Sequence, residues 1–182
     1  MAAIVGGLLL AGLVFAAARH PAGGSDSSAG LGLGKAVPSL SLPSTWGRRL
    51  SLAEYKGQKV VLFFYESASC GPCQDQLVEL QSSLAKIHAD GGTVLAASTD
   101  PLAMSASLAR QLGLGFPILA DQGGHLGSAF GIFDLTGGMN MGLVDRHSVF
   151  VINGRGKVQW KRLSLNQMHV PLANILSALK GS

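Results

Sequence analysis

Residues 60–73 have the sequence VVLFFYESASCGPC. The first six, Val60 to Tyr65, form an unbroken apolar and aromatic run, which is typical of a strand buried on both faces in the middle of a sheet. Cys70 and Cys73, which follow it, are the only two cysteines in the chain. A buried strand that leads directly into a C-x-x-C pair indicates a redox-active dithiol.

A helical pattern follows the dithiol. Four apolar residues recur at helical spacing: Leu77, Leu80, Leu84 and Ile87. Because Gly91-Gly92 ends this pattern, we predict one amphipathic helix over residues 71–90. Cys70 then lies at the N-cap, and Pro72 suits the first turn, where its missing N–H would lack a partner in any case. One helical turn separates the two sulfurs by a distance that a disulfide can close.

The helix start also predicts how the two thiols differ. Unpaired amides and the helix dipole favour a thiolate at Cys70, whereas Cys73 lies one turn further in and keeps a higher pKa. We expect both to be catalytic and to form a redox-active disulfide, with Cys70 attacking from the exposed mouth of the helix and Cys73 resolving. A structural disulfide would close too small a loop to stabilise much. A structural zinc site would need a second cysteine pair.

The rest of the chain alternates strands with helices. The predicted elements are a hairpin over 39–42 and 49–52, strands at 93–97 and 116–119, helices at 103–112, 124–130 and 171–179, and a hairpin over 148–152 and 157–161. This alternation implies a parallel core with right-handed crossovers. We therefore expect a single α/β domain over residues 37–182.

The N-terminal part differs in composition. Residues 3–18 are uncharged and apolar, slightly shorter than the roughly 17 to 25 residues of a membrane span and close to the core of a signal peptide. We predict that residues 1–18 are a signal or membrane anchor, and that residues 19–36, rich in Gly, Ser and Ala, form a flexible tether. The protein is then expected outside the cytoplasm, either anchored in the membrane through this segment or secreted. The orientation stays open, because the nearest basic residue, Arg19, follows the apolar run.

The net charge of +4 is unevenly distributed. After Asp145 the chain has no acidic residue and six basic ones: Arg146, Arg155, Lys157, Lys161, Arg162 and Lys180. Such a run is typical of a solvated hairpin face, the alternative being attraction to an anionic lipid surface or an acidic partner. Only Phe150 and Trp160 are aromatic in this part of the chain, and no recognition-helix pattern is present, so nucleic-acid binding is not expected.

Four segments carry a resemblance to a known family: SLSLPSTWGRRLSLAEYKGQKVVLFFY (39–65), CGPC (70–73), FPILADQGGHLGSAFGI (116–132) and VFVINGRGKV (149–158). Residues 37–180 resemble the redoxin branch of the thioredoxin superfamily, which includes the AhpC/TSA proteins and membrane-tethered thioredoxins. The resemblance implies a thioredoxin-like fold with a central mixed sheet flanked by helices. It also implies that residues 116–130 form the extra strand and helix of redoxins, and that the protein is a thiol-disulfide oxidoreductase.

The same resemblance implies a second register for the chemistry. Peroxidases of this family carry a proline and a threonine ahead of the reactive cysteine. Here Glu66 and Cys70 occupy those positions, and Cys73 falls on the reactive one. The position of the thioredoxin cis-proline holds His147, with Arg146 beside it. A thiol-dependent peroxidase is therefore the alternative function, and Glu66, Arg146 and His147 are candidate substrate or proton-transfer residues.

Residues 132–146 form a long loop that should pass close to the dithiol. Met139, Met141 and His147, with two thiolates, would make a soft donor set for Cu(I), which gives a copper-binding chaperone as a further alternative. Otherwise the methionines cover an apolar groove for protein substrates. We expect no bound cofactor, and we expect protein or small-molecule thiols and disulfides as partners. The remaining histidines are predicted to lie on the surface: His20, His88, His125 and His169.

Overall fold

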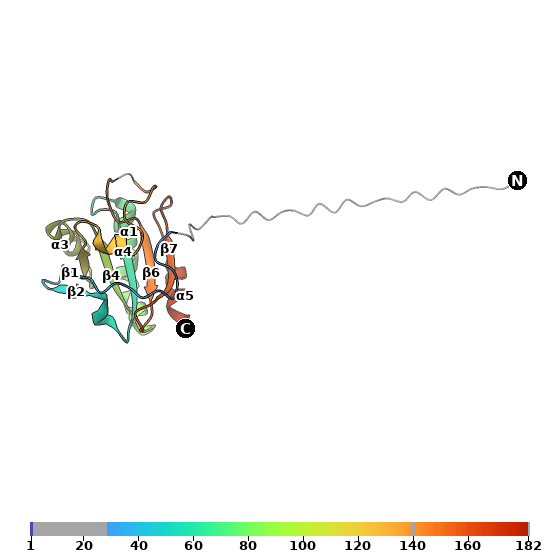
Figure 1. Ribbon diagram of the computed structural model, residues 1–182, viewed down its shortest axis with the longest axis horizontal. Coiled ribbons are helices and arrows are strands. Elements are labelled where there is room, and N and C mark those ends of the chain that lie inside the picture. The colour runs from blue at the N-terminus through green and yellow to red at the C-terminus, as the bar shows by residue number, and fades with distance from the viewer. Residues whose placement is uncertain (2–28, 140, 182) are drawn as a thin grey trace.

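The computed structural model describes Met1 and residues 29–139 and 141–181. Within these residues a five-stranded sheet has the order β5-β4-β3-β6-β7, with helices packed on it (Figure 1). Its strands are β3 (Lys59–Phe64), β4 (Gly92–Ser98), β5 (Ile118–Ala120), β6 (Ser148–Ile152) and β7 (Val158–Leu163). Strands β3, β4 and β5 are parallel, whereas β6 and β7 are antiparallel to their neighbours. A separate ribbon pairs β1 (Ser41–Pro43) with β2 (Arg49–Ser51).

Strand β3 is the centre of the molecule. It pairs with β4 on one side and with β6 on the other, and Val60 to Phe64 are almost completely buried. Because side chains alternate along a strand, Val61 and Phe63 belong to one apolar cluster and Leu62 and Phe64 to the other. The prediction of a central strand covered on both faces is confirmed.

The helices are η1 (Leu52–Tyr55), α1 (Gly71–Ser82), α2 (Leu84–Ala89), α3 (Leu102–Gln111), α4 (His125–Ala129) and α5 (Leu172–Lys180). Buried residues of α1, α2, α3 and α5 share one face of the sheet, and those of α4 lie on the other. The predictions at 103–112, 124–130 and 171–179 lie within one residue of α3, α4 and α5. Strand β5 and helix α4 are the extra elements expected over residues 116–130.

One predicted helix is wrong. Residues 71–90 form two helices, because the backbone leaves the α conformation at Ser83, with φ −105° and ψ 5°. Just before this break, Ser82 Oγ donates to the carbonyl oxygen of Val78 at 2.8 Å. Such back-bonding bends and weakens a helix, and the apolar spacing carries no sign of it.

The predicted domain start at residue 37 is also wrong. Leu31 N donates to the carbonyl of Phe130 at 2.7 Å, and Gly34 N donates to that of Val158 at 2.8 Å. Residues 29–36 are therefore part of the domain and not a free tether. Backbone hydrogen bonds hold this segment in place, so its Gly-rich composition gave no signal of it.

The remaining N-terminal predictions are not tested. Residues 19–28 of the predicted tether lie outside the described residues, as does the predicted signal or anchor apart from Met1. None of the described helices is long and apolar enough to cross a membrane.

Candidate functional site

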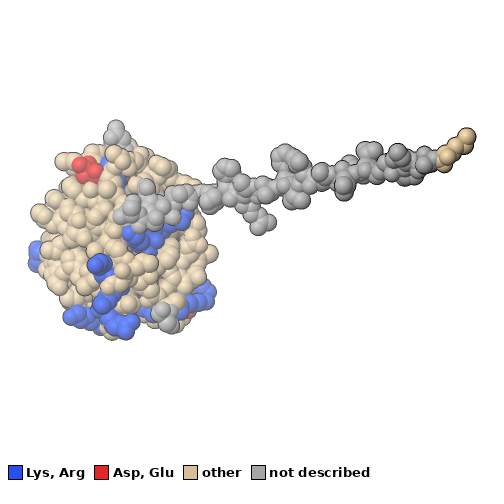
Figure 2. Space-filling view, turned by 45° about the vertical axis from the view of Figure 1, so that its right-hand side comes forward, with Lys and Arg blue, Asp and Glu red and all other residues tan. Residues whose placement is uncertain are grey.

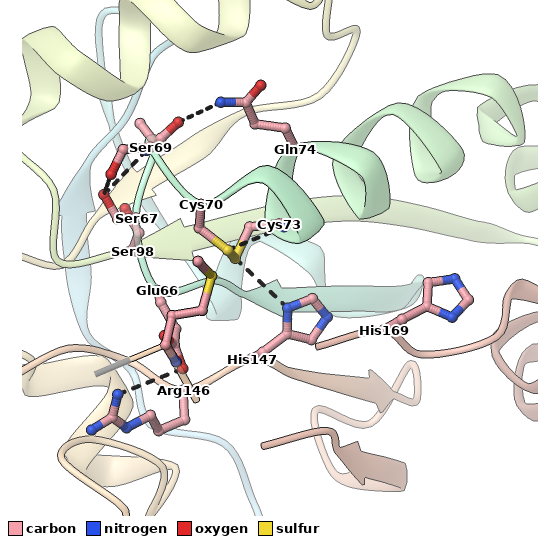
Figure 3. Close-up of a disulfide and its surroundings, with 12 residues drawn as sticks. Glu66, Ser67, Ser69, Cys70, Cys73, Gln74, Ser98, Arg146, His147 and His169 are labelled. Carbon is pink, nitrogen blue, oxygen red and sulfur yellow. Dashed lines mark hydrogen bonds and ion pairs between the residues drawn. A yellow bond between two sulfur atoms is a disulfide. The ribbon is translucent and has the colours of Figure 1, made fainter. Parts of the chain in front are cut away.

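The candidate site lies where strands β3 and β4 end and β6 begins. Since β6 runs antiparallel to β3, with Phe64 opposite Ser148, the residues that follow β3 lie next to those that precede β6. This topology brings the dithiol and Glu66 close to Arg146 and His147 (Figure 3). These residues were predicted from separate segments of the sequence, and the fold brings them together in one site.

Cys70 and Cys73 form a disulfide, with their Cα atoms 5.2 Å apart. Cys70 is the N-cap of α1, and its Sγ accepts a hydrogen bond from Cys73 N at 3.2 Å. The predicted helix start is thus confirmed. Both cysteines are completely buried in this oxidised state, so the expectation that Cys70 lies at an exposed helix mouth is wrong.

Tertiary hydrogen bonds hold the segment before Cys70 in place. Ala68 N donates to Asp100 Oδ2 at 2.6 Å, and Gln74 Nε2 donates to the carbonyl of Ala68 at 2.7 Å. Asp100, which follows β4, is itself buried. Asp100 was not predicted as a site residue, although its position shortly after a buried strand beside β3 was a usable signal.

His147 lies within hydrogen-bonding reach of the Cys73 sulfur. Its Nδ1 lies 3.7 Å from Cys73 Sγ, and its ring packs edge-on against Phe63 with centroids 4.8 Å apart. Burial lowers the pKa of His147 to about 4, with a smaller contribution from nearby His169. The ring is therefore neutral near pH 7.

Glu66 and Arg146 form a buried ion pair. Arg146 Nη1 lies 3.5 Å from Glu66 Oε1, and both side chains are almost fully enclosed. The pair also fixes the loop over residues 132–146, since Met139 N donates to Glu66 Oε2 at 3.0 Å and Arg146 Nε donates to the carbonyl of Leu135 at 2.5 Å. The prediction that this loop reaches the site is confirmed.

Glycine is required where this loop meets Glu66. Gly138 has φ 73°, and a Cβ there would lie 1.8 Å from Glu66 Oε1. The turn borders a cavity of about 360 Å³. The cavity is lined by Asp134, Leu135, Thr136, Gly137, Gly138 and Arg146. The Arg146 side chain thus contributes both to the ion pair and to the cavity wall.

Asp121 and Asp145 form a pair of buried carboxyl groups. Asp121 caps α4, accepting from Leu126 N at 2.9 Å and from Gly127 N at 2.8 Å. Asp145 is buried next to it, and among the described residues no donor reaches either of its oxygens. Burial, followed by the charge of Asp121, raises the pKa of Asp145 to about 8. Asp145 therefore keeps its proton near pH 7 and can donate it to the carboxylate of Asp121.

The copper hypothesis gains no support from the geometry. No group of three His, Cys, Asp or Glu in the described part of the chain lies close enough to hold a metal ion. His147 Nδ1 faces Cys73, and Met139 is 46% exposed. The donor set with Met139 and Met141 stays a prediction.

The other predicted surface residues are largely where sequence placed them. His88, His125 and His169 are exposed, and His20 lies outside the described residues. Among the basic residues after Asp145, Arg146 is the exception, because it is buried. Figure 2 shows Lys and Arg in several separate groups over one face, with few acidic side chains.

The chain is similar to known proteins. Residues 33–161 match the AhpC/TSA family. Peroxiredoxin Bcp of Escherichia coli is 28% identical over 127 residues, which cover 69% of this chain and 81% of that protein. Chloroplastic peroxiredoxin Q of Populus jackii is 29% identical over 148 residues, covering 81% of this chain and 66% of that protein. The crystal structure of peroxidoxin BcpB from Mycobacterium tuberculosis superposes with a TM-score of 0.72 at 25% identity, covering 81% and 96% of the two chains. These likenesses confirm the thioredoxin-like redoxin fold.

Proposed function

The chain belongs to the AhpC/TSA family, and on that premise we propose that it is a thiol-dependent peroxidase whose working groups are Cys73 and Cys70. It is an oxidoreductase, and the similar proteins are peroxiredoxins. This similarity favours reduction of peroxides over the thiol-disulfide exchange that the dithiol by itself suggests. Peroxidase activity thus moves from the alternative to the main hypothesis.

The bond between the two sulfurs is the observation that carries the proposal. Cys73 has the reactive position in the peroxidase register, and its Sγ is bonded to Cys70. A sulfenic acid formed on Cys73 therefore has a resolving thiol within bonding reach. No large movement of the backbone is needed to close the disulfide.

The proposed cycle has three balanced steps. The Cys73 thiolate attacks one peroxide oxygen, the O–O bond breaks, and the departing oxygen takes up a proton, leaving Cys73 as a sulfenic acid and releasing water or an alcohol. The Cys70 thiol then attacks the sulfenic sulfur, which closes the disulfide and releases water. An external dithiol supplies two electrons and two protons to restore the pair, and is itself oxidised to a disulfide.

The surrounding charges favour the first step. The N-terminus of α1 presents positive potential at the two cysteines, and the Arg146 guanidinium, paired with Glu66, supplies hydrogen-bond donors on the same side of the sheet. Such groups stabilise a thiolate before the attack and the negative oxygen that leaves during it. Glu66 holds Arg146 in position through their ion pair.

Rapid mixing of the reduced protein with hydrogen peroxide tests the proposal. We expect oxidation much faster than that of free cysteine. Cys70→Ser should accumulate a sulfenic acid on Cys73 that dimedone traps, and Cys73→Ser should react no faster than free cysteine. A wild-type rate equal to that of free cysteine would refute the peroxidase function.

Thiol-disulfide exchange is the second candidate function. The Cys70 sulfur accepts a hydrogen bond from the Cys73 amide at the helix start, and such a bond favours a thiolate at Cys70. In that function Cys70 attacks first. Cys73→Ser should then accumulate a mixed disulfide with a partner thiol, and iodoacetamide at pH 6 should label Cys70 of the reduced protein first. Preferential labelling of Cys73 would instead support the peroxidase register.

We also propose that the chain works outside the cytoplasm, held by or released from the signal or anchor at residues 1–18. The support is the uncharged apolar run at 3–18. Fractionation of cells that express the full chain tests this. Recovery of the whole chain with the cytoplasmic fraction would contradict it.

A further inference from the structure

We propose that His147 donates a hydrogen bond from Nδ1 to the sulfur of Cys73 and stabilises the thiolate of that cysteine. This role rests on the peroxidase function proposed above, in which Cys73 must react as a thiolate. His147 would then be a catalytic residue, since it contacts the reacting atom itself.

The direction of the hydrogen bond follows from the oxidised state. A disulfide sulfur carries no proton, so only Nδ1 can donate a hydrogen bond across the 3.7 Å contact between Nδ1 and Cys73 Sγ. In a neutral imidazole Nε2 is then the unprotonated nitrogen. Among the described residues Nε2 has no hydrogen-bond partner, so nothing there competes for the proton.

The fold holds the ring in a fixed orientation. Phe63 packs against it edge-on, with an angle of 64° between the rings. Ser164 N donates to the backbone carbonyl of His147 at 2.9 Å, which fixes the chain from the side of β7. His147 is completely buried, so water does not compete for its N–H, and a hydrogen bond to an anion is stronger for that reason.

The charged and titratable groups around the ring leave it neutral. Cys73 faces it from α1, and β3 presents the uncharged Phe63. His169, on the segment before α5, lowers its pKa further and is itself paired with Glu79 at 3.1 Å. On its own segment the adjacent Arg146 is occupied by Glu66. In the oxidised protein His147 is therefore a neutral donor near pH 7 and not an imidazolium.

The contact between His147 Nδ1 and Cys73 Sγ then acts both in the oxidation of Cys73 by peroxide and in the reduction of the disulfide. Before peroxide reacts, the N–H lowers the pKa of Cys73. When a reducing thiolate attacks the sulfur of Cys70, the disulfide bond breaks and its electron pair passes to Cys73. The new thiolate forms directly against the same N–H.

Titration of Cys73 in a Cys70→Ser background tests this, with the thiolate followed by its absorbance near 240 nm. His147→Phe keeps a ring against Phe63 but removes the donor. It should raise the pKa of Cys73 by about one to two units, since hydrogen bonds to charged groups are of that strength. His147→Gln, which restores an N–H donor, should recover part of the shift. His88→Gln, exposed on α2, is the matched control and should change nothing.

Kinetics give a second measure of the same effect. At pH 6 the His147→Phe protein should react with peroxide about 10- to 100-fold more slowly, because less thiolate is present. An unchanged pKa of Cys73 in His147→Phe overturns the proposal. If the pKa shifts but wild-type protein reduces peroxide no faster than free cysteine, the peroxidase function fails and the role of His147 stands.

Nitrogen NMR of the wild-type imidazole makes the test independent of any variant's folding. The proposal requires a proton on Nδ1 in both redox states, and the neutral Nδ1–H tautomer in the oxidised protein near pH 7. A proton on Nε2 in the oxidised protein would refute the donor role.

Discussion

Replacing Asp145 by asparagine should stabilise the protein, and the gain should grow as the pH rises. Burial beside Asp121 raises the pKa of Asp145 to about 8, from an ordinary value of 3.8 that the unfolded chain keeps. Below pH 3.8 the carboxyl group is protonated in both states. Between these values the native state keeps a proton that the unfolded state releases, so the wild-type protein loses stability as the pH rises, and above about 8 the loss is complete.

The size of the effect follows from this window. Between pH 3.8 and pH 7 the native proton costs about 1.4 kcal/mol per pH unit, which gives about 4 kcal/mol as an upper limit at pH 7. Asparagine does not ionise in either state. Its amide can also donate to Asp121, as the protonated acid does, so the variant avoids this cost without losing the hydrogen bond.

Urea unfolding of both proteins at pH 4, 5.5, 7 and 8 measures the difference in the free energy of unfolding. The difference should increase by several kcal/mol from pH 4 to pH 8. Asp134→Asn is the matched control, since Asp134 is exposed in the same loop, and its difference should stay constant. A difference for Asp145→Asn that does not change with pH would refute the raised pKa of Asp145.

Three further outcomes are expected. Deleting residues 2–28 should leave the midpoint of thermal unfolding of the domain unchanged. Deleting residues 2–36 should lower the midpoint, because the hydrogen bonds of residues 29–36 to the domain are lost. Equal midpoints for the two deletions would contradict this. Glu66→Gln should destabilise the fold by about 3 to 5 kcal/mol in urea unfolding, since Arg146 is left buried without its counter-charge, and a loss below about 1 kcal/mol would show that water screens the pair. Gly138→Ala should increase amide hydrogen exchange in the 132–146 loop, because its Cβ would overlap the Glu66 carboxylate; unchanged exchange would mean that the loop adapts at no cost.

Local pattern predicted most of the fold. The apolar run of β3, the glycines after α2 and the alternation of strands and helices depend on neighbouring residues, so sequence alone was sufficient for them. The break at Ser83 was not predicted. The hydrogen bond from the Ser82 side chain to the Val78 carbonyl weakens the helix there, and the apolar spacing is the same with or without it. The packing of residues 29–36 was missed because backbone hydrogen bonds supply much of it, and its few apolar side chains, such as Leu31, form no periodic pattern.

The site was predicted in part for the same reason. The dithiol and the N-cap at Cys70 follow from local sequence, and the resemblance supplied Glu66, Arg146 and His147. The contact between Ala68 and Asp100 joins residues 32 apart, and periodicity says nothing about such pairs. The burial of Cys70 depends on such contacts between distant residues, so Cys70 was wrongly predicted to be exposed.

The enclosed disulfide makes access a step of its own. Neither cysteine presents surface to solvent, so a reductant meets the sulfurs only during brief local openings of the chain around them. When reclosing is fast, the observed rate is the opening equilibrium constant multiplied by the rate at the open site. A bulky protein reductant that stabilises the open form would therefore outpace a small thiol of equal reactivity. The hydrogen bond between Ala68 and Asp100 then limits this opening. Asp100→Ala would remove it and increase the rate at which small thiols reduce the disulfide.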